Sequence, residues 1–321
     1  MLPGDEDFYD SSNEKLYLFI SDQEEKIYYI ELVEDEEALT ISKKGQAEIL
    51  VQNKSRPTYL EYDFNRHHLY YCEDDALKIK GIPITYKDNG EGVHAGPEYT
   101  ILSGTDCADL KLDKHGNLFF VERRSHFIAK LTPEQLDNAT DGFTVNATII
   151  YSQNLTQFMS YPESLTIERE YIYWTNVGQG KQHGIIHKAF TEPYVRNLPI
   201  QSYTIHDLEE SYAIAANNHY LFFSGLVTQH DINSNFSQNT TELFMMVKED
   251  ADYYYNISSG FFDSPKAMVT LKNHRLLVAD YNRVAIINTL VYPPSNASVR
   301  QDETIDLHEV RTPFGLALAT Q

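Results

Sequence analysis

The hydrophobic pattern is clearest in residues 275–288, where two short apolar runs flank a polar turn. Residues 276–279 and 284–287 are apolar, and Asp280, Tyr281 and Asn282 lie between them. Short apolar runs separated by turn-forming residues are typical of β-hairpins. This segment therefore predicts two strands joined by a tight turn.

The same pattern occurs six times along the chain. Each copy is anchored on the first apolar residue of its strongest strand: Leu16, Leu69, Leu118, Ile172, Leu221 and Leu276. Successive anchors are 53, 49, 54, 49 and 55 residues apart. A period of about 50 residues accommodates four short strands and their turns, which is the size of one propeller blade. The sequence therefore predicts an all-β protein, a single six-bladed β-propeller with four-stranded blades.

The two ends of the chain complete one another. A short segment, often containing proline, precedes every anchor strand except the first, and the last such segment, residues 311–320, has no anchor strand after it. We expect this C-terminal strand to pair with the N-terminal blade, because that closes the ring and leaves no open radial edge. The expected organisation is one propeller over residues 14–321, preceded by an acidic N-terminal arm over residues 1–13.

Several copies resemble known propeller repeats. LLVADYNRVAIIN at residues 276–288 is similar to the NHL repeat, and IYWTN at residues 172–176 resembles the YWTD repeat. The general pattern is shared with the gluconolactonase (SMP-30) and paraoxonase-like propellers, and LFFSGLV at residues 221–227 is distantly similar to the yellow/royal-jelly family. The resemblance implies a six-bladed propeller over the full chain. It implies no particular activity, because propellers host many unrelated functions.

Charge and composition exclude some classes of partner. The chain has 321 residues, of which 42% are hydrophobic, and a formal net charge of -21. That charge argues against nucleic acid and against anionic membrane surfaces, both of which need a basic face. No run approaches the ~18 apolar residues of a membrane helix. The acidity remains compatible with a cationic ligand, a calcium ion, or simply a soluble and self-repelling surface.

Acceptor motifs for N-glycosylation are more frequent than chance predicts. Asn-x-Ser/Thr occurs eight times, at Asn53, Asn138, Asn146, Asn154, Asn235, Asn239, Asn256 and Asn296. Chance predicts about two or three such motifs in a chain of this composition. We therefore expect a secreted or extracellular glycoprotein. Residues 1–7 lack the apolar segment of a signal peptide, so we expect that a signal was removed ahead of residue 1.

The two cysteines, Cys72 and Cys107, are too few for a disulfide scaffold or a zinc site. Cys72 ends one anchor strand and Cys107 begins the innermost strand of the next blade. An oxidising compartment would allow a disulfide between them. Two separate buried thiols are the alternative.

The central channel is the expected place for any chemistry. In the gluconolactonase-like enzymes a divalent ion is held there by oxygen ligands near the starts of innermost strands. The resemblance places these residues at the matching positions here: Thr58, Cys107, Glu163, Tyr212, Lys266 and Phe314. The ammonium of Lys266 repels a divalent ion and Phe314 offers no oxygen. We therefore expect no catalytic metal and no cofactor, although Ca²⁺ belongs to the hydrolase alternative.

Two interpretations of the channel residues remain open. In the first, Glu163 and Glu210 accept a small polar or cationic ligand between walls formed by Tyr161, Tyr212 and Phe314, with Asp106 near the rim. In the second, Lys266 pairs with Glu163 or Glu210 and plugs the channel.

Other polar residues are expected to be structural. Asp22, Asn176 and Asp280 recur just after anchor strands, where such side chains usually cap turns. His183 and His187 share one face of a predicted strand at ~13 Å, which is too far apart for one metal. Trp174 is expected in the core.

The sequence favours a non-catalytic secreted propeller that acts as a binding or assembly module, with other extracellular proteins or copies of itself as partners. One alternative is a metal-dependent hydrolase or lactonase of the gluconolactonase and paraoxonase type. A second is a binder of small cationic ligands of the yellow type.

Overall fold

The computed structural model describes most of the chain, in segments. These are residues 15–35, 40–52, 54–87, 92–154, 159–177, 184–192, 199–205, 208, 210–230, 237–248, 250–257, 262–271, 275–281, 283–289, 301–305, 307 and 310–320. The expected N-terminal arm, residues 1–13, and three of the expected glycosylation positions, Asn53, Asn235 and Asn296, lie outside them.

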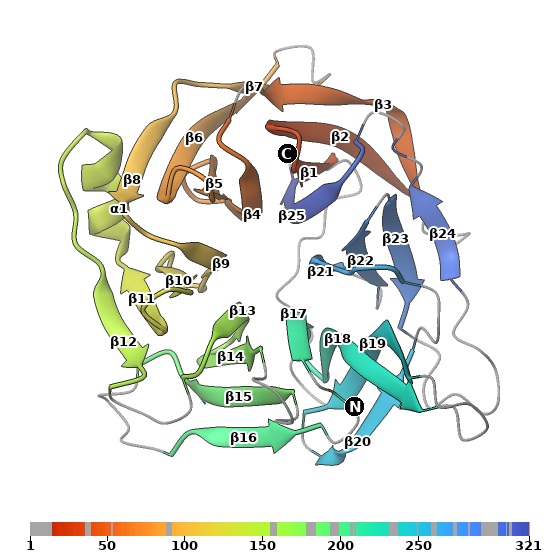
Figure 1. Ribbon diagram of the computed structural model, residues 1–321. Coiled ribbons are helices and arrows are strands. Elements are labelled where there is room, and N and C mark those ends of the chain that lie inside the picture. The colour runs from red at the N-terminus through yellow and green to blue at the C-terminus, as the bar shows by residue number, and fades with distance from the viewer. Residues whose placement is uncertain are drawn as a thin grey trace, which may run out of the picture.

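Six antiparallel sheets stand around one axis and form a six-bladed propeller (Figure 1). Each blade is given from its innermost to its outermost strand. Blade 1 has β25 (Pro313–Thr320), β1 (Leu16–Asp22), β2 (Lys26–Asp35) and β3 (Thr40–Val51). Blade 2 has β4 (Pro57–Asp63), β5 (His68–Glu73), β6 (Lys78–Tyr86) and β8 (Tyr99–Ser103), with the short β7 (Val93–Ala95) also on β6. Blade 3 has β9 (Cys107–Leu112), β10 (Leu118–Glu122), β11 (Phe127–Leu131) and β12 (Thr148–Ser152).

The other three blades follow the same order. Blade 4 has β13 (Pro162–Glu168), β14 (Tyr171–Asn176), β15 (Ile185–Phe190) and β16 (Gln201–Thr204). Blade 5 has β17 (Glu210–Ala216), β18 (Tyr220–His230), β19 (Ser237–Val247) and β20 (Asp250–Asn256). Blade 6 has β21 (Ala267–Leu271), β22 (Arg275–Asp280), β23 (Arg283–Asn288) and β24 (Gln301–Ile305). The predicted fold class and blade count are confirmed.

The core lies between the blades. The second strand of each blade has neighbours on both faces, and β22 is buried at every position. This explains why the anchor strands are continuously apolar instead of alternating. An apolar cluster fills each of the six blade junctions. Trp174, as expected, is fully buried, in the cluster between blades 3 and 4.

The ring is closed by the C-terminal strand, as predicted. β25 pairs antiparallel with β1, with Leu318 opposite Leu18. Gly315 makes the closest approach: its N–H donates to Ser21 Oγ at 2.7 Å, and Ser21 Oγ donates to the carbonyl oxygen of Thr58 at 2.6 Å. A side chain at Gly315 would meet that carbonyl oxygen, since an added Cβ would lie 2.4 Å from it. The closing strand is therefore bound to blade 2 as well as to blade 1.

The bridge made by Ser21 recurs at the corresponding position of other blades. Thr175 Oγ1 donates to the carbonyl oxygen of Tyr212 at 2.7 Å, and Ser224 Oγ donates to that of Pro265 at 3.1 Å. In both cases the acceptor belongs to the inner edge of the next blade. We call these side chains the bridging residues. They satisfy buried carbonyl groups at the junctions, where an unpaired group would be costly.

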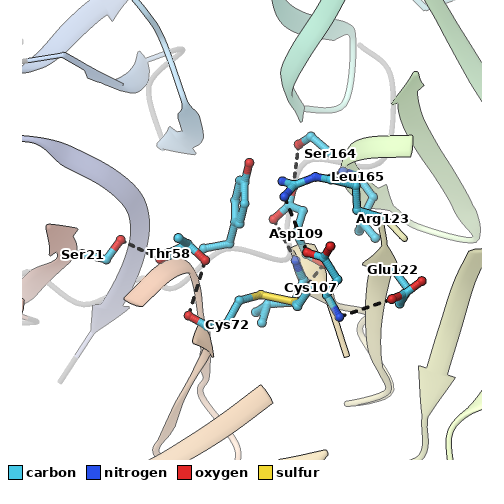
Figure 2. The surroundings of a disulfide bond; sticks show 12 residues. Ser21, Thr58, Cys72, Cys107, Asp109, Glu122, Arg123, Ser164 and Leu165 are labelled. Carbon is cyan, nitrogen blue, oxygen red and sulfur yellow. Dashed lines mark hydrogen bonds and ion pairs between the residues drawn. A yellow bond between two sulfur atoms is a disulfide. The ribbon is translucent and has the colours of Figure 1, made fainter. Parts of the chain in front are cut away.

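In blade 2 the bridging position is Cys72, and the bridge is a disulfide. Cys72 is bonded to Cys107 at the start of β9 in blade 3, with the two Cα atoms 5.6 Å apart (Figure 2). Both cysteines are buried. One junction is therefore linked covalently at the position where three others use a hydroxyl hydrogen bond.

Carboxylates at the ends of the second strands cap the neighbouring turns. Asp22 accepts hydrogen bonds from the Glu24 N–H at 2.9 Å and the Thr312 hydroxyl at 2.8 Å. Asp280 accepts one from the Ser264 N–H at 2.6 Å. The expected capping role is confirmed for these two. Asn176 differs, because its Nδ2 lies 2.9 Å from Nε2 of His187.

One helix, α1 (Pro133–Thr140), lies between β11 and β12 and was not predicted. A capping box begins it: Gln135 N–H donates to Thr132 Oγ1, and Thr132 N–H donates to the Gln135 side chain. Leu136 and Ala139 pack into the cluster between blades 2 and 3. In the described part of the chain no helix is long and apolar enough to cross a membrane.

Candidate functional site at the channel mouth

The residues expected around the axis come from the starts of the innermost strands. Glu163 and Phe314 are the second residues of β13 and β25, and Thr58 is the second residue of β4. Tyr212 is the third residue of β17, and Lys266 directly precedes β21. The repeat therefore brings these five positions to one end of the ring.

The sixth expected position is wrong by one residue. The residues that pair with the last residue of the second strand are Pro57, Cys107, Pro162 and Pro313, in blades 2, 3, 4 and 1. Cys107 is thus equivalent to the prolines, and Ala108 is equivalent to Thr58 and Glu163. The reason is a register shift near the start of β9, as near the start of β4, which the spacing of apolar residues does not reveal.

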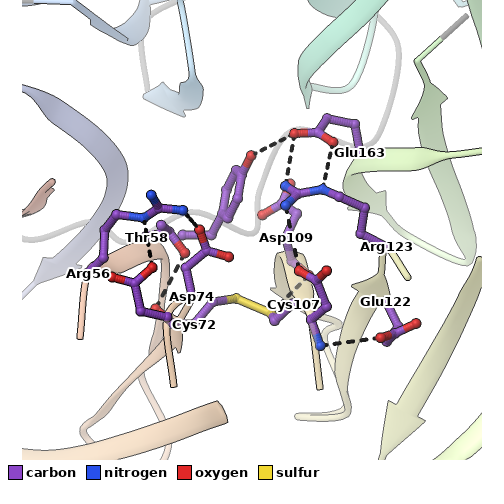
Figure 3. A network of polar contacts seen from close by, with 12 residues as sticks. Arg56, Thr58, Cys72, Asp74, Cys107, Asp109, Glu122, Arg123 and Glu163 are labelled. Atoms are coloured by element: carbon purple, nitrogen blue, oxygen red, sulfur yellow. Dashed lines mark hydrogen bonds and ion pairs between the residues drawn. A yellow bond between two sulfur atoms is a disulfide. The ribbon is translucent and has the colours of Figure 1, made fainter. Parts of the chain in front are cut away.

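An arginine from the turn after β10 binds the carboxylate of Glu163. Arg123 Nε and Nη2 donate to Glu163 Oε2 and Oε1, each at 3.1 Å (Figure 3). Arg123 Nη1 also lies 3.6 Å from Asp106 Oδ1, and the Tyr59 hydroxyl donates to Glu163 at 3.4 Å. Burial of Arg123 opposes its charge, but the carboxylate of Glu163 outweighs this and raises the arginine pKa. Arg123 is therefore held in its charged form.

Aromatic rings fill the rest of the mouth. The ring of Phe314 packs edge-on against Tyr59, with centroids 5.2 Å apart. Lys266 Nζ lies 5.2 Å from the ring centroid of Tyr212, whose hydroxyl donates to Glu210 at 2.5 Å. The second interpretation, in which Lys266 pairs with a carboxylate, is not observed, because no ion pair between described residues joins it to Glu163 or Glu210.

Tyr161 lies against the neighbouring blade. Its ring centroid is 4.3 Å from that of His126, in the turn after β10, and its backbone has a φ of 52°. It does not line the axial cavity. Of the aromatic residues expected to form walls, Phe314 and Tyr212 pack at the mouth and Tyr161 does not join them.

Below the mouth is a small axial cavity. It is lined by Tyr59, Leu60, Asp109, Lys111, Ser164, Ile214, Lys266, Ala267, Met268 and Leu316. Its water-accessible space is about 10 Å³, which is about the space that one water molecule requires. This cavity is therefore too small for a molecule of the size of a sugar lactone.

Asp109 is a buried carboxylate beside this cavity. It accepts hydrogen bonds from Ser164 Oγ at 2.5 Å, Leu165 N–H at 3.0 Å and Leu110 N–H at 2.8 Å. Burial raises the pKa of Asp109. The bonds to Ser164 and Leu165 link blade 3 to blade 4 at the axis.

An ion pair accompanies this carboxylate. Lys111 Nζ donates to Glu61 Oε2 at 3.2 Å. Burial raises the pKa of Glu61 and by itself would lower that of Lys111, but the carboxylates of Glu61 and Asp109 raise it. Sequence reasoning missed all three residues. The available signal was the alternation Asp109-Leu-Lys111 in an innermost strand whose counterparts are mainly apolar.

The polar groups around the axis are thus engaged with one another. Among the described residues, no group of three or more His, Cys, Asp or Glu side chains is arranged to hold a metal ion. The acceptors expected to bind a cationic ligand, Glu163 and Glu210, are bonded to Arg123 and Tyr212.

Comparison with known proteins shows the fold. No family model matches the chain, and no curated protein matches it. A chain in the structure of a nidogen/laminin complex is 15% identical with a TM-score of 0.67, and the match covers 96% of this chain and 98% of that one. A gluconolactonase from Xanthomonas campestris is 10% identical with a TM-score of 0.56, covering 92% and 87%. A streptogramin B lyase is 15% identical with a TM-score of 0.51, covering 94% and 91%.

These solved structures share the propeller architecture with this chain across nearly its full length. Their names include both a protein complex and enzymes. At identities of 10–15% the likeness concerns the fold alone and shows nothing about activity.

Proposed function

We propose that this chain is a non-catalytic, secreted propeller that binds another extracellular protein, or a second copy of itself, through its outer surfaces. The observation that carries the proposal is the ion pair at the channel mouth together with the small cavity below it. Glu163 is held by two bonds from Arg123, and the cavity beneath has space for about one water molecule. Such a ring would bind a partner protein through its two faces and its rim.

The energetics of the mouth support this assignment. A ligand that enters along the axis must displace Arg123 from Glu163, which leaves two partly buried charges unpaired. Breaking a buried ion pair by removing one partner typically costs about 3–5 kcal/mol. The pair is partly exposed, with Arg123 at 34% and Glu163 at 20%, so its cost is smaller than this range. The likeness to a chain solved in a nidogen/laminin complex is consistent with this proposal, because that chain belongs to a complex between proteins.

The metal-dependent hydrolase is the second candidate, favoured by the likeness to a gluconolactonase. Lys266 and Phe314 stand where that chemistry needs oxygen donors. At ~4 Å and an effective dielectric of ~20, a +1/+2 pair is repelled by about 8 kcal/mol. The carboxylates nearby offset part of this repulsion, but they already have partners.

The test measures association and catalysis on the same preparation. We expect the protein to form a defined oligomer in light scattering as its concentration rises, or to bind an extracellular matrix protein such as laminin in surface plasmon resonance. Calcium titration calorimetry and hydrolysis assays with lactones and aryl esters should give no signal. Micromolar calcium binding that Glu163→Gln abolishes, together with turnover, would reverse the assignment.

A further inference from the structure

Two long segments of this highly charged chain, residues 142–162 and 211–230, contain no Asp, Glu, Lys or Arg, and the first of them includes an outermost strand. These four residue types make up 23% of the whole chain. The outermost strand is β12 of blade 3, with the sequence Thr-Ile-Ile-Tyr-Ser. β12 pairs with β11 on one side only, so its outer edge presents unpaired backbone groups. An uncharged, β-prone edge strand is a template for pairing with other chains.

The other outer strands are protected in ways that β12 lacks. Charged residues occur within three of them, β3, β20 and β24. β8 is flanked by α1, whose Leu136 and Ala139 pack into the same apolar cluster as Ile101 of β8. β16 is short and polar, with the sequence Gln-Ser-Tyr-Thr. Charges and covering elements are the usual devices that prevent edge pairing.

The surface beside β12 is also apolar. Phe143, between α1 and β12, is 65% exposed, and Ile149 within β12 is 44% exposed. Their neighbours Ile150 and Tyr151 face the core and are 4% and 7% exposed. Blade 3 therefore combines an open edge with two exposed apolar side chains.

Three of the eight glycosylation motifs surround this edge. Asn138 lies on α1, Asn146 precedes β12, and Asn154 follows it. All three residues are exposed, and their side-chain amide groups make no hydrogen bond to another described residue. β12 is about 17 Å long at ~3.3 Å per residue, so acceptor sites stand at both ends of a short strand.

We propose that N-linked glycans on Asn146 and Asn154, with a third on Asn138, shield the uncharged edge of blade 3. A glycan is bulky, hydrated and uncharged, and it does for β12 what charged side chains do for β3 and β24. The exposed Phe143 and Ile149 then lie beneath the chain's own sugars and do not form a docking site. The proposal rests on the secreted state included in the proposed function.

The first experiment establishes occupancy. The protein is produced in a eukaryotic secretory system, and glycopeptide mass spectrometry measures the occupied fraction at each site. We expect Asn146 and Asn154 to be occupied in most molecules. Unmodified asparagine at both positions would overturn the proposal.

The second experiment tests the role of the sugars. At a concentration at which the parent is monomeric, the double variant Asn146→Gln/Asn154→Gln should lose monomer several-fold in size-exclusion chromatography with light scattering. The matched control is Asn256→Gln, which removes an exposed acceptor site at the end of the charged strand β20 and should leave the monomer fraction unchanged. Far-ultraviolet circular dichroism of the remaining monomer confirms that it is folded.

A charge should replace the glycans if edge protection is their role. Adding Ile149→Lys to the double variant places an ammonium on the exposed edge and should restore the monomer. A double variant as monomeric as the parent, or one that stays aggregated with the lysine, would overturn the proposal. So would a monomeric double variant that gains affinity for laminin, because the edge would then be a covered docking site. Absence of any partner for the glycosylated protein would refute the proposed function and leave edge protection intact.

Discussion

His187 should make the stability of the ring depend on pH between neutrality and pH 4. The side chain lies in β15 and is 2% exposed. Its Nδ1 is 2.8 Å from Ser202 Oγ and its Nε2 is 2.9 Å from the amide nitrogen of Asn176. Because the Asn176 amide donates, Nε2 accepts and the neutral ring carries its proton on Nδ1. A second proton on Nε2 would point at the N–H donor of Asn176, so protonation is unfavourable in the folded state.

Burial lowers the pKa of His187 from 6.5 to about 4. The unfolded chain takes up a proton near pH 6.5 and the folded chain only near pH 4. The contribution of neutral His187 to the stability of the folded state is therefore complete above pH 6.5, and it is lost as the pH falls from 6.5 to about 4. At about 1.4 kcal/mol per pH unit, the free energy of unfolding should fall by about 2 kcal/mol at pH 5 and about 3 kcal/mol at pH 4.

The assay compares the parent with His187→Gln by thermal unfolding at several pH values from 7.5 to 4. With a specific unfolding entropy of ~2.1 cal/mol/K per residue, a loss of about 3 kcal/mol lowers the parent Tm by roughly 4 °C. The variant starts less stable but should lack this part of the slope. The chain has one tryptophan, Trp174, whose ring centroid is 5.1 Å from that of His187, so its fluorescence reports on the same site. Equal slopes for the two proteins would refute the reasoning.

Two further predictions concern the junctions between blades. Replacing the disulfide by Cys72→Ala/Cys107→Ala should lower the free energy of unfolding by about 2–5 kcal/mol in denaturant titration. Cys72→Ser with Cys107→Ala should lower it less, because a hydroxyl at this position can bridge as it does in other blades. Equal losses in the two variants would contradict the bridging role. Gly315→Ala should cost about 1–3 kcal/mol, because the methyl group meets a carbonyl oxygen of β4 at 2.4 Å, and an unchanged Tm would show that β25 can shift.

The architecture could be predicted because its signals are local. Residues 276–279 and the turn after them specify a hairpin without reference to the rest of the chain, and six copies with complementary ends imply a ring. The helix α1 also had a local signal in the Thr132–Gln135 capping box, but it falls within a stretch that the repeat pattern treats as a connection between strands.

The site could not be predicted because its contacts are not local. Arg123 lies in a hairpin turn of blade 3, and nothing in the sequence around Glu163 indicates that this arginine will reach it. Asp109 and Lys111 face the axis only because of the register of β9, which shifts at Val121 and Glu122. A shift of one residue exchanges the two faces of a strand, so the alignment misplaced Cys107 and overlooked its buried neighbours.

The shared position of Ser21, Cys72, Thr175 and Ser224 suggests how this ring acquired its covalent link. A side chain there already reaches the next innermost strand, so its sulfur equivalent needs only a cysteine at the start of that strand, and Cys107 supplies it. Several serine codons differ from a cysteine codon by a single base, so one mutation can change the bridging serine into a cysteine. Each hydroxyl-bridged junction is therefore a position where a disulfide could form after two substitutions to cysteine, and an oxidising environment would allow such a bond to be selected.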